Sequence, residues 1–234
     1  QINDEVLKAL KKYDTEEIGA ILISDISVNE EVAEKLDEIH KQGIMVILCD
    51  HHATAEWLNK YDWAFVAEKD SKGILRCGTY WMAKQFPEIY QKMGMFVHAV
   101  DAWDCWKWKD SGNIWAKNLN SLLSVMGHED FISYIDSLDI MGMKHPRELF
   151  TSKAKTMVKV YDKMVSKSTW HCEKNMWEGD FQIEHNGQPK TLHGGIVFTL
   201  QYISDIADSI LDNHPDLDFL LLMSIPRSLS FRCR

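Results

Sequence analysis

The sequence has few cysteines and none of the spacings that would give them a structural role. Its five cysteines are odd in number, widely spaced and include no CxxC pair. This pattern favours free thiols over a disulfide framework or a cysteine-based zinc site. Free thiols are typical of the reducing cytoplasm, which is where we expect the protein to be found.

Long apolar runs and an excess of positive charge are also missing. No stretch approaches the ~18 to 20 apolar residues of a membrane span, and no signal peptide is visible, so we expect no membrane partner. The formal net charge of −9 argues against broad electrostatic capture of duplex nucleic acid, which depends on basic surface. It leaves room for a short nucleotide substrate held by metal ions in a local pocket.

The composition is that of an ordinary globular protein. Of the 234 residues, 45% are hydrophobic and 26% are charged, enough to bury a sizeable core. The apolar run 44–49 after Gly43 predicts a buried parallel strand, and the shorter run 18–23 predicts another. An amphipathic helix at 29–42 lies between them. Strand, helix and strand at this spacing indicate a crossover unit of a parallel sheet, so the fold class is α/β.

Polar side chains follow both strands of this unit. Asp25 comes directly after the first strand, and Asp50, His51 and His52 end the second. Because open α/β folds bind ligands outside the carboxyl ends of their strands, we expect these side chains to converge. Carboxylate and imidazole ligands suit Mn²⁺, Mg²⁺, Fe²⁺ or Zn²⁺, and the abundance of oxygen favours the harder ions. On spacing alone, a histidine after a buried strand is more often structural than a ligand.

The chain divides into three predicted parts. Residues 1–146 form the domain that carries the parallel sheet, and residues 114–136 are expected to be helical and amphipathic. A lysine-rich segment at 147–168 indicates a linking helix. Residues 169–234 predict a smaller α/β domain of short strands around a helix. We expect the active site to lie in the cleft between the two domains.

The order of the polar motifs resembles the DHH phosphoesterase superfamily. Asp25 in "ILISDIS" is followed by the Asp-His-His at 50–52 and by Gly78-Thr79 at the start of a predicted helix. The fourth motif is matched best by Asp104 in "VDAWDCWKW", with Asp101 as the alternative. This similarity spans most of the chain.

The C-terminal segment "SIPRSLSFR" resembles a strand of the substrate domain that accompanies DHH domains. That strand carries a Ser-x-Arg, here Ser230 and Arg232. The resemblance therefore implies a parallel-sheet DHH domain, a linking helix and a DHH-associated substrate-binding domain.

The resemblance implies a metal site and assigns its ligands. Asp25 would bridge two metal ions, His51 would ligate one of them, and Asp104 would complete the shell of that ion, with Asp101 as the fallback. The expected ion is Mn²⁺, with Mg²⁺ or another divalent cation as the alternative. Two ions are expected in the complete protein.

The resemblance also implies two catalytic residues and several substrate contacts. Asp50 would orient an imidazole, and His52 would contact the phosphate or donate a proton to the leaving group. Arg232, beside Ser230, would hold a phosphate, as a planar bidentate donor can. Thr79 would contribute to substrate binding at the start of its helix.

The tryptophans beside the fourth motif are candidate base-stacking residues. Stacking on Trp103 or Trp106 would contribute about 1–3 kcal/mol per base. The alternative is that these side chains pack the core and close a loop.

Two motifs of the superfamily are not found. The first motif, a His/Asn-x-Asp-x-Asp after a strand, has no match, and neither has the Gly-Gly-Gly-His segment that follows the Ser-x-Arg strand. The sequence also begins without Met. We therefore expect a fragment with a truncated substrate domain. Without flanking segments, one metal site would lack most of its ligands.

The function implied by the resemblance is a hydrolase acting on phosphoester bonds. Among its members, the short-oligonucleotide exonucleases (nanoRNase-like) match best, with attack by a metal-bound hydroxide on a short single-stranded oligonucleotide. One alternative substrate is a small nucleotide, such as a cyclic dinucleotide or a 3′-phosphorylated adenosine nucleotide. Another alternative is a degenerate, non-catalytic nucleotide-binding protein. The sequence leaves a homodimer open.

Overall fold

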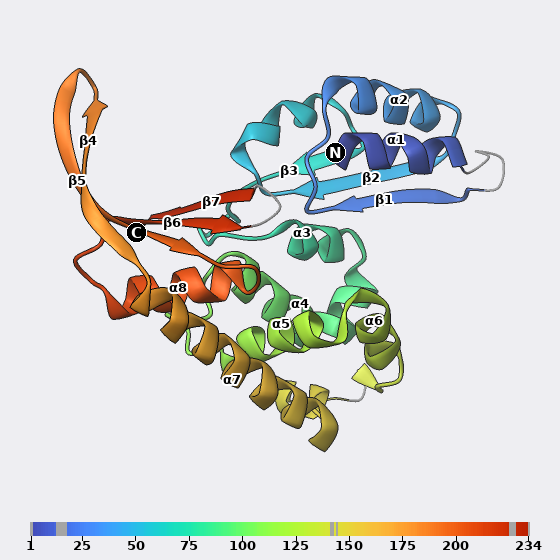
Figure 1. Cartoon of the computed structure of the whole chain (residues 1–234). Helices are drawn as coiled ribbons and strands as arrows, with labels where there is room; N and C mark the ends of the chain where they lie inside the picture. The colour runs from blue at the N-terminus through green and yellow to red at the C-terminus, as the bar shows by residue number, and fades with distance from the viewer. Residues whose placement is uncertain (1, 13–17, 141–142, 144, 225–227, 234) are drawn as a thin grey trace. The chain divides into compact units, whose positions relative to one another are not determined.

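The computed structural model describes residues 2–12, 18–140, 143, 145–224 and 228–233. The chain forms two compact units, Gln1–Thr151 and Ser152–Arg234. Both combine helices with a β-sheet, which confirms the α/β class (Figure 1). The helix expected to link the domains begins at Ser152 and is grouped with the second unit.

A parallel sheet forms the centre of the first unit. Its strands are β1 (Ala20–Ser24), β2 (Met45–Asp50) and β3 (Ala64–Val66), in the order β1-β2-β3. Ser24 lies opposite Cys49, so β1 and β2 end at the same edge of the sheet. The helix α2 (Glu30–Lys41) joins them. The predicted strand–helix–strand unit is therefore confirmed.

Helix α2 begins where the sequence places a capping residue and an apolar face. The Asn29 side chain accepts a hydrogen bond from the backbone N–H of Val32 at 3.0 Å, which satisfies one of the free donors at the helix start. The apolar face of α2 packs into the core of the unit. This core also receives apolar side chains from α1 (Ile2–Lys12) and the 3₁₀ helix η1 (Ala53–Lys60).

Several described helices follow β3 in the first unit. They are α3 (Gly78–Gln85), α4 (Pro87–Asp104), α5 (Ile114–Met126), α6 (His128–Asp136) and the 3₁₀ helix η3 (Pro146–Leu149). The helical character expected at 114–136 is present, but it is divided between two helices. Gly127 has φ 79° and ψ 169°, a conformation essentially restricted to glycine, and it separates α5 from α6.

The second unit contains a mixed sheet and two helices. Its elements are α7 (Ser152–Lys174), β4 (Trp177–His185), β5 (Gln188–Phe198), α8 (Ile203–Asn213), β6 (Phe219–Ser224) and β7 (Ser228–Cys233). In the order β4-β5-β6-β7, the middle pair is parallel and the outer pairs are antiparallel. Side chains from α7, α8, β5 and β6 form a separate core.

Two further expectations concern the chain as a whole. All five cysteines are free, as their spacing predicted. Among the described helices, none is both long enough and apolar enough to cross a membrane.

Candidate metal centre

The edge at which β1 and β2 end carries the polar residues that the sequence placed there. Asp25 directly follows β1 and has φ 63°, in the left-handed region that few residues other than glycine adopt. Its backbone N–H donates to the carbonyl oxygen of Cys49 at 2.9 Å, which holds the turn against β2. Strained backbone of this kind is concentrated at functional sites.

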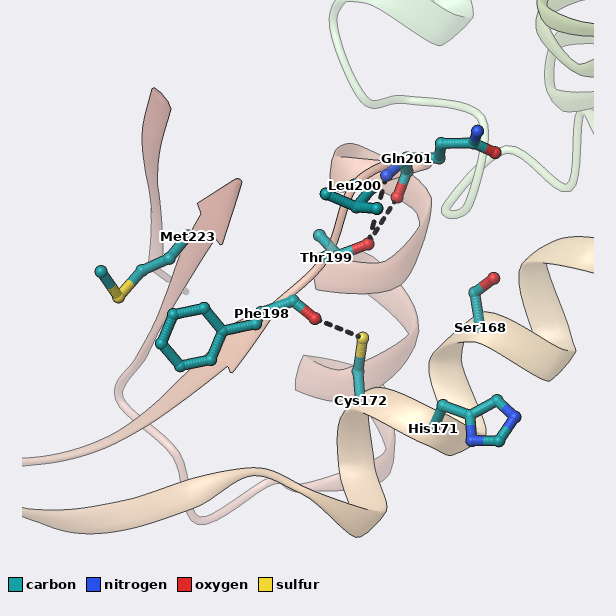
Figure 2. A pocket seen from close by; sticks show the side chains of 8 residues that line it. All are labelled: Ser168, His171, Cys172, Phe198, Thr199, Leu200, Gln201 and Met223. Atoms are coloured by element: carbon teal, nitrogen blue, oxygen red, sulfur yellow. Dashed lines mark hydrogen bonds between the residues drawn. The ribbon is translucent and has the colours of Figure 1, made fainter. Parts of the chain in front are cut away.

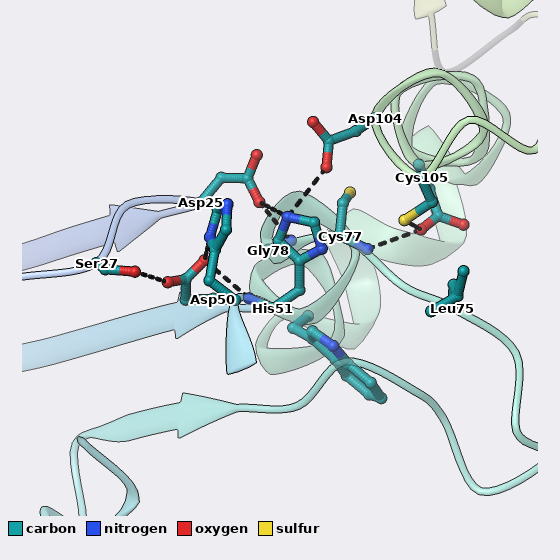
Figure 3. A network of polar contacts seen from close by, with 12 residues as sticks. Asp25, Ser27, Asp50, His51, Leu75, Cys77, Gly78, Asp104 and Cys105 are labelled. Atoms are coloured by element: carbon teal, nitrogen blue, oxygen red, sulfur yellow. Dashed lines mark hydrogen bonds and ion pairs between the residues drawn. The ribbon is translucent and has the colours of Figure 1, made fainter. Parts of the chain in front are cut away.

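One histidine nitrogen lies close to two carboxylates. His51 Nε2 is 3.5 Å from Asp25 Oδ1 and 3.3 Å from Asp104 Oδ2. Figure 3 shows both carboxylates directed at the same ring. Adjacent ligands about 2.1 Å from one octahedral ion are about 3 Å apart, so each of these pairs is close to the spacing of neighbouring ligands. Asp104 reaches the site because α4 extends through residue 104.

The Asp104 carboxylate lies close to the negative charge of Asp25. Among the described residues, its buried Oδ2 has no hydrogen-bond partner. Burial, followed by the charge of Asp25, raises the pKa of Asp104. A divalent cation between these carboxylates and His51 would supply the missing charge. The residues present therefore fit a metal ion.

The first turn of α3 holds Asp25 from another direction. The backbone N–H of Gly78 donates to Asp25 Oδ1 at 2.7 Å (Figure 3). A Cβ atom at position 78 would lie 2.6 Å from the Asp25 backbone nitrogen, so this approach requires glycine. The other residue of this motif, Thr79, is half-buried in the same turn, and its contact with substrate stays a prediction.

Asp50 lies beneath the two histidines and is fully buried. Its carboxylate accepts hydrogen bonds from Ser27 Oγ at 2.6 Å and from the His51 backbone at 2.8 Å, and its Oδ1 lies 2.8 Å from His52 Nδ1. Burial alone would raise the pKa of Asp50, but these hydrogen bonds together lower it. The hydrogen bond to Asp50 raises the pKa of His52. Sequence reasoning did not identify Ser27, whose contact spans 23 positions along the chain.

Asp101, the alternative ligand, has other partners. Its Oδ1 accepts a hydrogen bond from the Cys77 backbone at 2.9 Å. Its Oδ2 lies 2.9 Å from Arg76 Nη1 and 2.7 Å from Lys107 Nζ. Both oxygens of this 2% exposed carboxylate are therefore already bound.

Cys105 is a neighbour of the site that the sequence reasoning did not single out as a ligand. Its sulfur, Asp104 and His51 place ligand atoms within 4.8 Å of one another. Burial raises the pKa of the Cys105 thiol to about 12. Because the thiolate is the form that binds metals, the Cys105 thiol would have to lose its proton to become a ligand.

The tryptophans beside Asp104 form a stack. The Trp103 ring lies 5.7 Å from the Trp106 ring and 5.7 Å from the Trp108 ring. Trp106 is 44% exposed and has φ 56°. Trp103 lines a small apolar cavity of about 100 Å³. Trp103 is half-buried beside this cavity, whereas the Trp106 ring is exposed. Base stacking by either ring stays a prediction.

The predicted substrate residues Ser230 and Arg232 lie in β7 of the second unit. Arg232 donates to the Phe231 carbonyl oxygen at 3.1 Å and lies 3.4 Å from Ser204 Oγ. Ser230 is half-buried and pairs with Leu222 of β6. Residues 225–227 of the "SIPRSLSFR" segment lie outside the described residues. Whether this strand serves the metal site stays a prediction.

The second unit also contains a cavity that the sequence did not indicate. It has a volume of about 360 Å³ and lies where β5 and β6 end (Figure 2). Phe198 and Leu200 on its rim are each 70% exposed. Polar groups of Ser168, His171 and Gln201 also line it. Its lining therefore combines apolar surface with a few hydrogen-bonding groups, as small-molecule sites do.

The chain is similar in sequence to a known ribonuclease. The chain is 27% identical over 212 residues to oligoribonuclease NrnB of Bacillus subtilis (strain 168). The match covers 88% of this chain and 50% of that protein, so the chain spans about half the length of this relative. The similarity supports the resemblance to the DHH phosphoesterase superfamily.

No family model matches the chain. The crystal structure of an uncharacterized protein from Helicobacter pylori G27 aligns with a TM-score of 0.40 and 17% identity, over 98% of this chain and 73% of that one.

Proposed function

We propose that this chain is a metal-dependent, DHH-type phosphodiesterase that hydrolyses short oligonucleotides. The observation that carries the proposal is the single nitrogen of His51 between the carboxylates of Asp25 and Asp104. The similarity to an oligoribonuclease supports the choice of substrate. Because the candidate ligands are mostly oxygens with one nitrogen, we propose Mn²⁺ as the ion, with Mg²⁺ as the alternative.

In this proposal, Asp25, His51 and Asp104 hold the cation. A bound divalent ion supplies positive charge that activates water and stabilises the departing oxygen. His52 provides the proton. Its Nδ1 is held by Asp50, and the raised pKa favours the protonated ring, which can donate from Nε2 to the leaving oxygen. Asp50 is thereby a positioning residue for His52.

The remaining roles concern the substrate. Trp106, exposed two residues after Asp104, stacks on a base in this proposal. Arg232 holds a phosphate, with Ser230 beside it in β7. A short single-stranded substrate agrees with the net charge of −9, because local contacts then replace broad electrostatic attraction.

The test is hydrolysis of end-labelled RNA and DNA of two to five nucleotides by the full-length protein, with Mn²⁺, with Mg²⁺ and with chelator. We expect Mn²⁺-dependent release of mononucleotides. Removing a ligand, in Asp25→Ala or His51→Ala, lowers the rate by about 100-fold or more, because it weakens charge stabilisation worth several kcal/mol.

The chain provides a matched control pair. His40 Nε2 lies 3.4 Å from Asp62 Oδ1, in a contact of the same kind away from the site. His40→Ala and Asp62→Ala should keep the activity of the parent. Full activity in Asp25→Ala or His51→Ala would remove these residues from the site.

Hydrolysis of a cyclic dinucleotide or a 3′-phosphorylated adenosine nucleotide in place of oligomers would favour the alternative substrates. Binding without hydrolysis would indicate a non-catalytic protein.

A further inference from the structure

A buried charge cluster lies beside the metal centre and belongs to none of the proposed roles. Asp101 forms ion pairs with Arg76 and Lys107 while only 2% exposed. Arg76 also pairs with Asp70 at 2.9 Å. Two carboxylates are therefore balanced by two cations. A buried carboxylate with this many partners is held in one position, because breaking any contact leaves an uncompensated charge.

This cluster fixes the start of α3. Asp101 Oδ1 accepts the hydrogen bond of the Cys77 backbone N–H at 2.9 Å. The next N–H along the chain, that of Gly78, donates to Asp25 Oδ1 at 2.7 Å. Two successive backbone donors therefore connect Asp101 to the carboxylate of Asp25. A displacement of Asp101 moves the donor that orients Asp25.

The same cluster fixes the end of α4. Asp101 and Asp104 lie in the last turn of this helix, three positions apart. Lys107, just beyond the helix end, donates both to Asp101 Oδ2 and to the Leu75 carbonyl oxygen, at 2.7 and 2.6 Å. The segment before α3 is thus tied to the turn that carries Asp104.

We propose that Asp101 is a positioning residue for the metal centre, through Cys77 and Gly78 to Asp25 and through the last turn of α4 to Asp104. This role rests on the metal site of the proposed function. It replaces a metal-ligating role for Asp101, whose two oxygens are occupied by the Cys77 N–H and by the cations. Contacts behind the ligands commonly set metal affinity as strongly as some ligands do.

The test is titration of the full chain with Mn²⁺ by calorimetry, using Asp101→Asn. The asparagine keeps the size of the side chain but removes the charge that holds Arg76 and Lys107. We expect Mn²⁺ to bind about 10–100-fold more weakly at unchanged stoichiometry. Hydrolysis should recover towards the parental kcat when Mn²⁺ is raised, because the ligands themselves are intact.

Two further variants complete the experiment. Asp37→Asn removes another carboxylate that pairs with a lysine, Lys41, within α2, and it should leave Mn²⁺ affinity unchanged. Lys107→Met removes one of the two cations that pair with Asp101, and the Lys107 side chain is 24% exposed. We expect it to weaken Mn²⁺ binding as well, but less than Asp101→Asn does. Lys107→Met decides the question if Asp101→Asn does not fold.

The outcomes separate this role from the proposed function. If folded Asp101→Asn melts at a lower temperature but binds Mn²⁺ as tightly as the parent, Asp101 is structural only and the positioning role is wrong. If Asp101→Asn folds and loses one bound ion entirely at every Mn²⁺ concentration, Asp101 is a ligand and the role is also wrong. If the parent chain binds no Mn²⁺, the metal centre itself is contradicted.

Discussion

At the scale of single residues, the position most sensitive to added volume in the site is Gly78. A Cβ atom there would meet Asp25 at its backbone nitrogen, Cα and Oδ1, at 2.6 to 2.7 Å. Neither side can yield easily, since Asp25 is fixed by Cys49 and by its own left-handed backbone. The absence of a side chain at Gly78 is therefore a requirement of the candidate site.

We predict that Gly78→Ala both destabilises the protein and weakens Mn²⁺ binding. Overpacking of this kind costs about 1–3 kcal/mol. The helix α4 offers a control in Gly94, where a Cβ atom would have nothing within 4 Å. Gly94→Ala should raise the free energy of unfolding by up to about 1 kcal/mol, because alanine favours helix. Urea unfolding and Mn²⁺ titration measure both effects, and equal behaviour of the two variants would contradict the prediction.

The order of the motifs predicted which polar side chains come together, but not the partners that hold them. Asp25, His51 and Asp104 meet as the motif order suggested. Asp101 was kept as the alternative ligand because it too is an aspartate in the same short motif. Its partners Arg76 and Cys77 lie 25 and 24 positions away, and no local pattern links them.

At the scale of elements, the charge cluster makes the contact between the start of α3 and the end of α4 sensitive to acid. Burial raises the pKa of Asp101, but the hydrogen bonds from Lys107, Cys77 and Arg76 outweigh it, so the pKa is lowered. An aspartate whose folded pKa lies below its unfolded value of about 3.9 adds stability that is present above that value. This stability is lost as pH falls through the folded pKa.

We therefore predict that the urea midpoint falls as the pH drops below about 4. The measurement is made with chelator, so that metal binding does not contribute. Asp101→Asn should lower the midpoint at pH 7 and give a shallower fall in acid, because one of the titrating carboxylates is gone. An acid profile of Asp101→Asn parallel to that of the parent would contradict the role of Asp101 in the acid sensitivity.

The elements themselves could be predicted where local signals were strong. Asn29 and the apolar face after it marked the start of α2, and the uninterrupted apolar run marked β2. The break within the helical region 114–136 was not predicted, because the apolar periodicity continues across Gly127. Periodicity reports which residues are apolar, whereas the break depends on the backbone angles of one glycine.

At the scale of the whole chain, the two units have separate cores. Sequence patterning predicted two α/β parts but placed a distinct linking helix at 147–168 between them. The helix α7 extends to Lys174, beyond that segment, and contributes Cys172 to the core of the second unit. The apolar periodicity of α7 shows that one of its faces is buried. It does not show whether the preceding or the following part of the chain packs against that face.

Because the two units have separate cores, a metal ion bound to the first unit should stabilise that unit and not the second. A ligand that binds only the folded form stabilises it by about 2.7 kcal/mol at 100 times its dissociation constant. With Mn²⁺ at this excess, we expect slower amide hydrogen exchange in β1, β2, α3 and the last turn of α4. The strands β4 to β7 should keep the exchange rates that they have with chelator.

The second unit contains another group of side chains that could bind Mn²⁺ in this experiment. Glu178, His193 and Asp216 place three ligand atoms within 4.8 Å of one another on its surface, with two of the three side chains exposed. His193 Nδ1 already lies 2.9 Å from Asp180. Protection confined to this group would contradict a metal centre at His51. We expect the slower exchange around His51 to be lost in His51→Ala and kept in His193→Ala. This result requires an ion at the edge where β1 and β2 end, because a bound ion slows exchange around the ligands that it joins.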